Sequence, residues 1–167
     1  MKHLCVTLAA LVFMGITAAA AAQGIKIGFV DAERINRESV PAEQASKELE
    51  KEFAPRAKEL QRREAQIKAM QDQLEKNAMT MSDSERRSKE QDLARLTLDF
   101  QRMQREYRED LNLRRNQELA SLFERANKVI KQIAEKEGYD LILQEAVYRN
   151  PRIDITDKVL KALANSK

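Results

Sequence analysis

The chain has 167 residues and is highly but evenly charged, with 30 Lys and Arg against 27 Asp and Glu. One Cys, one His, four Gly and no Trp leave little material for thiol catalysis, a zinc site or a glycine-rich phosphate loop. The abundance of Ala, Glu, Lys, Arg, Gln and Leu is typical of a mostly helical domain.

Residues 1–22 have the pattern of a secretory signal peptide. Lys2 and His3 give a positive start, an apolar run follows, and the segment ends in small residues at Ala22, after which we expect cleavage. The apolar run is too short to cross a bilayer, which takes about 20 apolar residues. Cleavage removes Lys2, His3 and Cys5 and leaves 29 basic against 27 acidic side chains. We therefore expect an exported protein with no thiol, no imidazole, no metal site and no cofactor.

The mature chain opens with a predicted strand and two helix starts. Residues 25–30 alternate apolar with small or polar side chains, which predicts a short strand. Asp31 is placed to cap a first helical turn. Ser39 and Pro41 then restart a helix, because Pro is tolerated in a first turn.

A long amphipathic helix is predicted from Ala42 onward. Its apolar residues recur mostly three, four or seven apart, which makes a narrow stripe on one face. They are Ala45, Leu49, Phe53, Ala57, Leu60, Ile67, Met70, Leu74 and Ala78. The other face is charged, with acidic and basic side chains about four apart. Pro55 removes one backbone hydrogen bond, so we expect a kink there.

Residues 77–85 break this pattern and predict a reversal between two helices. Ser82, with Glu85 three positions later, forms a capping box. Asn77 is expected to end the first helix in a left-handed conformation. A second apolar stripe then follows, and Gly138 is its expected C-cap. This stripe runs through Leu93, Leu96, Phe100, Met103, Tyr107 and Leu111 and resumes at Leu119, Leu122, Ala126, Val129 and Ile133.

The C-terminal part is predicted to form strands followed by a short helix. Residues 140–144 and 146–148 are β-rich, Asn150 precedes Pro151 in a turn, and 152–155 predicts another extended piece. Thr156 is expected to cap a last helix that ends near Leu163.

This order of elements predicts an α+β, mostly α fold. The strands lie at the two ends of the chain and must meet, so the two long helices are expected to form an antiparallel hairpin. We call residues 23–42 and 119–167 the body and residues 43–118 the arm, with 77–85 as its tip. At about 1.5 Å per residue the arm should be roughly 50 Å long.

A body of this size buries little apolar surface, and small cores are only marginally stable. We therefore expect its exposed apolar side chains to pair with those of identical chains in a homo-oligomer. The candidates are Ile25, Ile27, Phe29, Leu141, Leu143 and Val147.

The mature sequence resembles the Skp/OmpH family of periplasmic chaperones over nearly its whole length. The most specific segments are FAPRAKELQR at 53–62 and DITDKVLK at 154–161, and the signal peptide and the Met81-Ser82-x-x-Glu85 turn agree. The resemblance implies a jellyfish-like homotrimer with its body at the strands and a cavity between three arms. It also implies that unfolded outer-membrane β-barrel proteins are held there in the periplasm, without ATP, before membrane insertion. In this family a basic cluster is linked to lipopolysaccharide, for which Arg114 and Arg115 are the nearest match.

A chaperone without an energy source needs weak contacts at many points, which suits flexible methionines. The candidate client-binding residues are Met70, Met79, Met81 and Met103. Met70 and Met103 fall where they could instead fill the seam between the helices. The charges of the arm either keep the helices soluble or attract acidic clients.

Other function classes fit the residues less well. Interleaved acids, the lack of an aromatic stacking face and the signal peptide argue against nucleic acid. Carboxylate pairs such as Glu48 and Glu52 lie on an exposed face, which argues against an enzyme. The remaining alternative is an exported coiled-coil scaffold of the cell envelope that binds no client. Such a rod would keep its seam continuous, whereas here the pattern breaks at 77–85.

Overall fold

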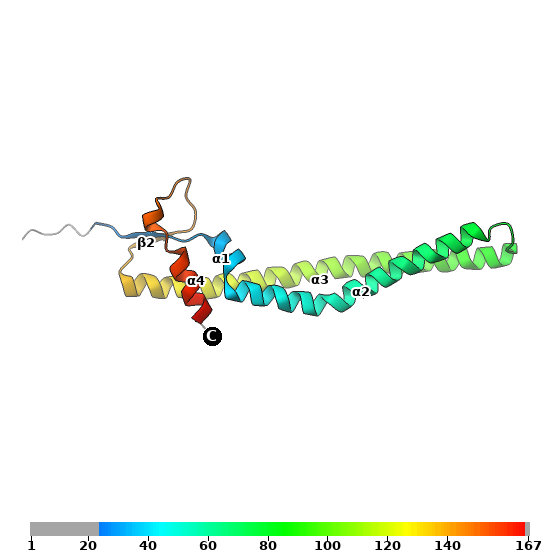
Figure 1. Ribbon diagram of the computed structural model, residues 1–167, viewed down its shortest axis with the longest axis horizontal. Coiled ribbons are helices and arrows are strands. Elements are labelled where there is room, and N and C mark those ends of the chain that lie inside the picture. Colours follow the sequence, from blue (N-terminus) through cyan, green and yellow to red (C-terminus); the bar gives the residue numbers. More distant parts are fainter. Residues whose placement is uncertain (1–23, 166–167) are drawn as a thin grey trace, which may run out of the picture.

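The computed structural model describes residues 24–165, so the predicted signal peptide lies outside the described residues. Figure 1 shows a small body at one end and a long two-helix arm that leaves it. The fold is mostly helical with one small sheet, in agreement with the sequence-based prediction. Its elements are β1 (Ile27–Phe29), α1 (Ala32–Glu38), α2 (Val40–Lys76), α3 (Asp83–Glu137), β2 (Leu141–Leu143), a 3₁₀ turn η1 (Pro151–Ile153) and α4 (Thr156–Asn165).

The sheet joins the N-terminal segment of the described chain to the residues that follow α3. β1 and β2 are parallel, with Ile27 opposite Leu141 and Phe29 opposite Leu143. On the other side of β1, the Ile155 amide donates to the Phe29 carbonyl at 2.9 Å. The packing over β1 is tight, because a Cβ added to Gly28 would lie 3.2 Å from Ile155 Cδ1 and from the Tyr139 ring.

Residues 146–148 do not form the strand predicted for them. They lie in an exposed loop after β2, and Val147 and Tyr148 are among the most exposed apolar side chains of the described residues. The loop is held at its far end by Arg149, which donates to Asp154 and lies over the Phe29 ring. Residues 152–155 are also only partly extended, since η1 occupies their first half. Composition favoured a strand at both places, but no neighbouring strand pairs with the loop.

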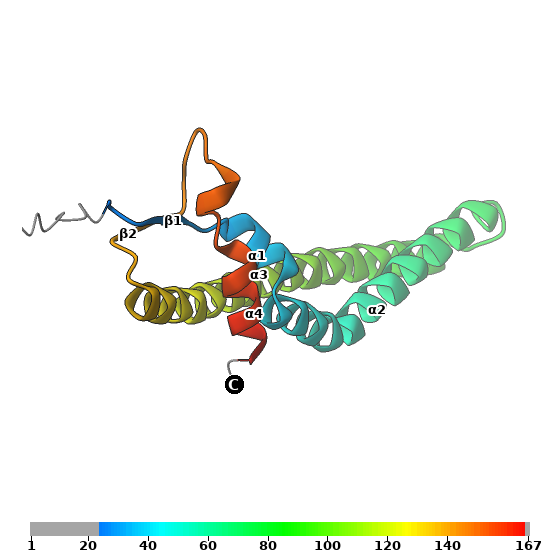
Figure 2. The ribbon, with the colours of Figure 1, turned by 60° about the vertical axis from the view of Figure 1, so that its left-hand side comes forward.

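The body core forms where α4 crosses the C-terminal part of α3 (Figure 2). Val30 and Ile35 join it from the N-terminal segment. The buried residues of this core are Val30, Ile35, Leu122, Ala126, Val129, Ile130, Ile155, Val159 and Leu163.

Most helix ends lie where the sequence predicts them. The Asp31 side chain accepts from the Arg34 amide at 2.9 Å, and the Ser39 hydroxyl accepts from the Ala42 amide at 3.3 Å. Gly138 has a φ of 69°, the left-handed C-cap expected for glycine. The prediction for Asn77 was wrong in its conformation. Asn77 is the C-cap of α2, but its φ of −101° and ψ of 8° lie outside the left-handed region.

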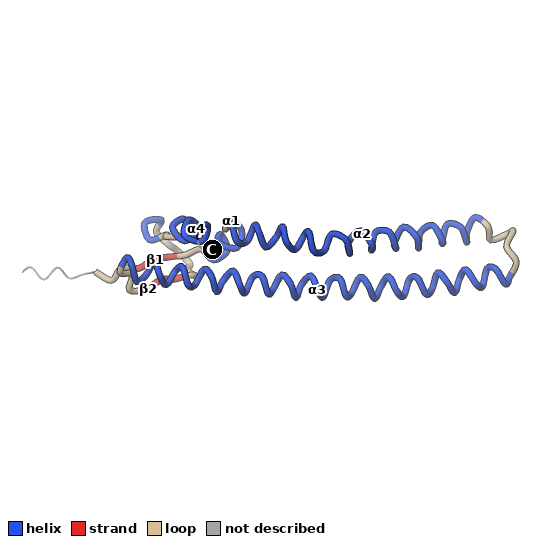
Figure 3. Tube along the Cα trace, turned by 90° about the horizontal axis from the view of Figure 1, so that it is seen from below, coloured by secondary structure: helices blue, strands red, loops and turns tan. Residues whose placement is uncertain are grey.

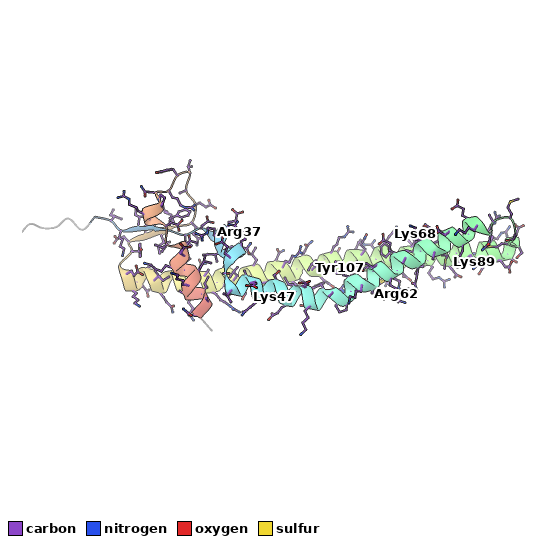
Figure 4. The ribbon with its side chains drawn as sticks, in the orientation of Figure 1. Arg37, Lys47, Arg62, Lys68, Lys89 and Tyr107 are labelled. Atoms are coloured by element: carbon purple, nitrogen blue, oxygen red, sulfur yellow. The ribbon has the colours of Figure 1, made fainter. Side chains whose placement is uncertain are left out.

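In the arm, α2 and α3 lie alongside each other from the body to the tip (Figure 3). Arg114 contacts Glu52, and Arg56 contacts Asp110. Partners on α3 thus move back toward the tip as α2 advances, so the helices run in opposite directions. α2 stays helical through Pro55, and its ribbon changes direction between the labelled Lys47 and Arg62 (Figure 4).

Candidate functional site

The arm is the part of the molecule with the least buried surface. Between residues 40 and 121, Phe53 is the only buried side chain, at 4% exposure. Most of the other apolar stripe residues in this range are half-buried along the seam between α2 and α3, while Ala78 and Leu119 are exposed. The arm therefore keeps much of its apolar material within reach of solvent.

One compact cluster joins the two helices near the bend of α2. Phe53 meets Tyr107 edge to face, with ring centroids 5.8 Å apart. The Arg56 guanidinium lies 5.5 Å from the Phe53 ring centre and 5.9 Å from that of Tyr107. Arg56 also donates to Asp110 at 2.8 Å. We call these four residues the aromatic node.

Two open hollows lie along the seam between the node and the body. The larger, of about 590 Å³, is bounded by Phe53, Tyr107 and Leu111, and the other, of about 340 Å³, reaches Leu122 in the core. Both are lined by Leu49 and Arg115, together with Ser46. The helices are thus less closely packed here than at the node.

The structure separates the four candidate methionines. Met79 at the tip is 96% exposed, whereas Met81 is half-buried. Met70 and Met103 are half-buried in the seam, as the seam-filling interpretation expects. Met103 lies beside Tyr107, about 30 Å along α3 from the tip. The four side chains therefore do not form one site.

The tip that carries Met79 is an ordered, hydrogen-bonded turn. The Ser82 hydroxyl accepts from the Glu85 amide at 3.3 Å, and Glu85 accepts in return from the Ser82 amide at 3.0 Å. This is the predicted capping box. The bond from the Ser82 hydroxyl, together with that from its amide, lowers the pKa of the Glu85 carboxyl. Thr80 adds a bond to the Asn77 carbonyl at 3.2 Å.

The two candidate arginines differ in their surroundings. Arg114 is engaged within the chain, through contacts with Glu52 at 3.3 Å and Glu118 at 3.1 Å. Arg115 is exposed and has no ion pair within residues 24–165. Only Arg115 of this pair therefore presents a free guanidinium.

The candidate oligomerisation residues also divide into two groups. Ile25 is 75% exposed, Leu141 47%, Leu143 36%, and Val147 is fully exposed. Phe29 does not share this exposure, contrary to the prediction, because it is only 3% exposed and is covered by its own chain, including Arg149. Ile27 lies between these extremes as a half-buried residue.

Within residues 24–165, no group of three or more His, Cys, Asp or Glu side chains is arranged to hold a metal ion. In the same part of the chain, no helix is both long and apolar enough to cross a membrane.

The sequence analysis missed two features of the arm. One is the aromatic node, since periodicity placed Phe53 and Tyr107 in stripes without pairing them. The other is the exposure of Leu98 and Leu113, at 66% and 57%. Both leucines fall outside the three-four spacing of the seam, and this was the available signal that they do not face α2.

A family model described as outer membrane protein (OmpH-like) matches residues 26–163. The chain belongs to the OmpH-like family. This confirms the resemblance seen in the sequence. The chain is 32% identical over 162 residues to the chaperone protein Skp of Yersinia enterocolitica, and the match covers 96% of this chain and 97% of the relative. It is 29% identical over 141 residues to a Skp-like protein of Pseudomonas aeruginosa, covering 83% and 84%.

The fold is shared with a solved structure of an OmpH-like protein from Caulobacter crescentus CB15. The TM-score is 0.73 over 84% of this chain and 85% of that one, at 17% identity. Relatives named as chaperones and an OmpH-like fold place the protein in a family of chaperones and not of enzymes.

Proposed function

We propose that the protein is an ATP-independent holdase chaperone of the periplasm. It binds unfolded outer-membrane β-barrel proteins and prevents their aggregation before membrane insertion. The observation that carries this proposal is the arm, on which Phe53 is the only buried side chain between residues 40 and 121. An arm of half-buried and exposed apolar side chains, interleaved with charges, suits weak contacts at many points. The membership of the OmpH-like family supports the same function.

The proposed assembly is a homotrimer with its body at the centre and its arms around a cavity. Exposed Ile25, Leu141, Leu143 and Val147 beside the small sheet support self-association, because such side chains are costly to leave in water. Sedimentation of the mature chain tests this part by itself, and a stable monomer would overturn it.

Within this proposal, Met79 is the tip residue best placed for client contact, and Arg115 is the free member of the basic pair predicted to contact lipopolysaccharide or a membrane surface. An envelope scaffold without clients is less well supported, because the chain turns back after Lys76 instead of continuing as a rod.

The decisive experiment dilutes a urea-unfolded outer-membrane barrel protein into buffer with and without the mature protein. Light scattering should fall when the chaperone is equimolar as trimer. Unchanged scattering at that ratio would overturn the holdase function.

A further inference from the structure

The face of α3 that points away from α2 has a composition of its own. The seam residues Leu96, Phe100 and Tyr107 face α2, and a helix advances by about 100° per residue. The opposite side therefore carries a second set of residues, which we call the α3 stripe. Its charged and apolar members are Arg87, Arg95, Leu98, Arg102, Arg105, Glu109 and Leu113.

The two leucines of the α3 stripe are unusual for the arm. Leu98 is 66% exposed and Leu113 is 57% exposed. On α2 the only large apolar side chain of comparable exposure is Val40, at the body end. A single exposed leucine is ordinary on a protein surface. Two on one face of an otherwise polar helix suggest a surface that is covered in use.

Three of the four arginines of the α3 stripe are free, and the fourth, Arg102, pairs with Asp99 at 3.3 Å. Arg87, Arg95 and Arg105 are exposed and make no hydrogen bond or ion pair within residues 24–165. By contrast, arginines elsewhere on the arm are paired with carboxylates of the same chain, as are Arg56, Arg62, Arg63, Arg86 and Arg114. Glu109 is the one acidic residue that falls among the stripe positions, so the stripe has a net positive charge.

We propose that the α3 stripe is a docking surface for extended, acidic segments of unfolded polypeptide that carry apolar side chains. The inference rests on the proposed holdase function and assigns it a binding surface. Fifteen positions separate Leu98 from Leu113, or about 22 Å along the helix. An extended segment of about seven residues covers that length, at roughly 3.3 Å per residue. Such a segment places one apolar side chain on each leucine and its carboxylates near the arginines.

The same chemistry fits an anionic bilayer less well. A helix that lies in a membrane interface presents a broad apolar face, usually with aromatic side chains, to the acyl chains. The α3 stripe offers two leucines about 22 Å apart, no aromatic residue, and Glu109 between Arg105 and Leu113. Single side chains of a flexible polypeptide can occupy such separated spots.

The test measures fluorescence anisotropy of a dye-labelled unstructured peptide with two leucines about seven positions apart and aspartates between them. The mature full-length protein is compared with L98S/L113S and with R95Q/R105Q. A matched control, K51Q/K68Q, removes two exposed lysines of α2 that make no ion pair within residues 24–165. All substituted side chains are exposed, so thermal unfolding midpoints should stay unchanged.

We expect each stripe variant to weaken peptide binding about tenfold, which corresponds to about 1.4 kcal/mol, and the α2 control to bind as the wild type does. A second peptide with lysines in place of the aspartates should bind at least about tenfold more weakly. Equal binding by all four proteins, or equal binding of the two peptides, would overturn the inference. The inference would also be overturned if the stripe variants bind the peptide as the wild type does but no longer float with anionic phospholipid vesicles. That result would assign the stripe to a membrane surface.

The aggregation assay separates this inference from the function on which it rests. If the wild-type protein fails to suppress aggregation of an unfolded barrel protein, the holdase function fails. If the wild type suppresses aggregation and both stripe variants do so equally well at every ratio, only the α3 stripe is excluded as the docking surface.

Discussion

Phe53 on α2 meets Tyr107 on α3 edge to face, with ring centroids 5.8 Å apart and ring planes inclined by 79°. Arg56 covers both rings and donates to Asp110. Because Phe53 is the only buried side chain between residues 40 and 121, this contact is the main fixed point between the two helices of the arm. It lies next to Pro55, where α2 lacks a backbone donor.

Replacing Phe53 with Ala should destabilise the arm by about 3 kcal/mol, since it removes a buried aromatic side chain and its ring contact. Urea unfolding followed by circular dichroism measures the loss. Leu98→Ala is the control, because that side chain is 66% exposed and should cost less than about 0.5 kcal/mol. Equal costs for the two variants would contradict the role given to the node.

Gly28→Ala should destabilise the body by about 2 kcal/mol. The new Cβ would lie 3.2 Å from Ile155 and from the Tyr139 ring, so β1 or its neighbours must shift. Gly24→Ala is the matched control, because the methyl group that it adds would have no atom within 4 Å. Thermal unfolding of both variants measures the difference, and a Gly28 variant as stable as the Gly24 variant would show that the contact relaxes freely.

The ion pairs of Glu59 predict an acid-side loss of stability. Hydrogen bonds from Arg62, and then from Arg63, lower the pKa of Glu59 from 4.5 to about 2. Because the folded-state pKa is depressed, the stabilisation is complete above about pH 4.5 and is lost as the pH falls through 2. The carboxyl is exposed, so the effect should be small and should shrink further in high salt.

Differential scanning calorimetry from about pH 6 down to about pH 2, a range that spans the ordinary and the lowered pKa, compares the wild type with Glu59→Gln. The variant should show a flatter acid-side decline in its unfolding midpoint. Glu48→Gln, at an exposed position without an ion pair in residues 24–165, should follow the wild type. Identical profiles for all three proteins would show that Glu59 does not contribute to the acid sensitivity.

Replacing both Met79 and Met81 with Ser should leave folding intact and shorten client retention. Met79 is 96% exposed, and the turn that carries it is held by the Ser82 and Glu85 capping box and not by the methionines. The release rate of a labelled unfolded barrel protein measures retention. Met79→Ser alone should account for most of the change, because Met81 is half-buried. An unchanged release rate in the double variant would exclude the tip from client contact.

Local features were predictable to within a residue or two. The caps predicted at Asp31, Ser82 and Gly138 are present, and α2 begins directly after Ser39, where the sequence predicted a helix restart. Each depends on a hydrogen bond or a backbone conformation set within about four residues, so neighbouring sequence is sufficient. The two strands of the sheet were also predicted to within two residues of their ends, although their pairing joins distant parts of the chain.

Two of the errors concern features that depend on distant neighbours. Residues 146–148 have strand-forming side chains but no partner strand, and Phe29 has its own chain above it instead of an open face. Asn77 ends α2 without a left-handed residue, because its amide still reaches the Gln73 carbonyl at 3.1 Å. The outcomes for residues 146–148 and Phe29 cannot be read from nearby residues, whereas the Asn77 cap is local and can close the helix in more than one way.

The order of the elements, the helix ends, the break at the tip and the family follow from the amino-acid sequence, because periodicity and capping are local and 26–163 match the family as a whole. Which apolar and charged side chains are covered became clear only in the folded chain. Phe53 is buried while Leu98 is not, and Arg114 is paired while Arg115 is free, because burial and pairing depend on what the opposite helix brings to the same level of the arm.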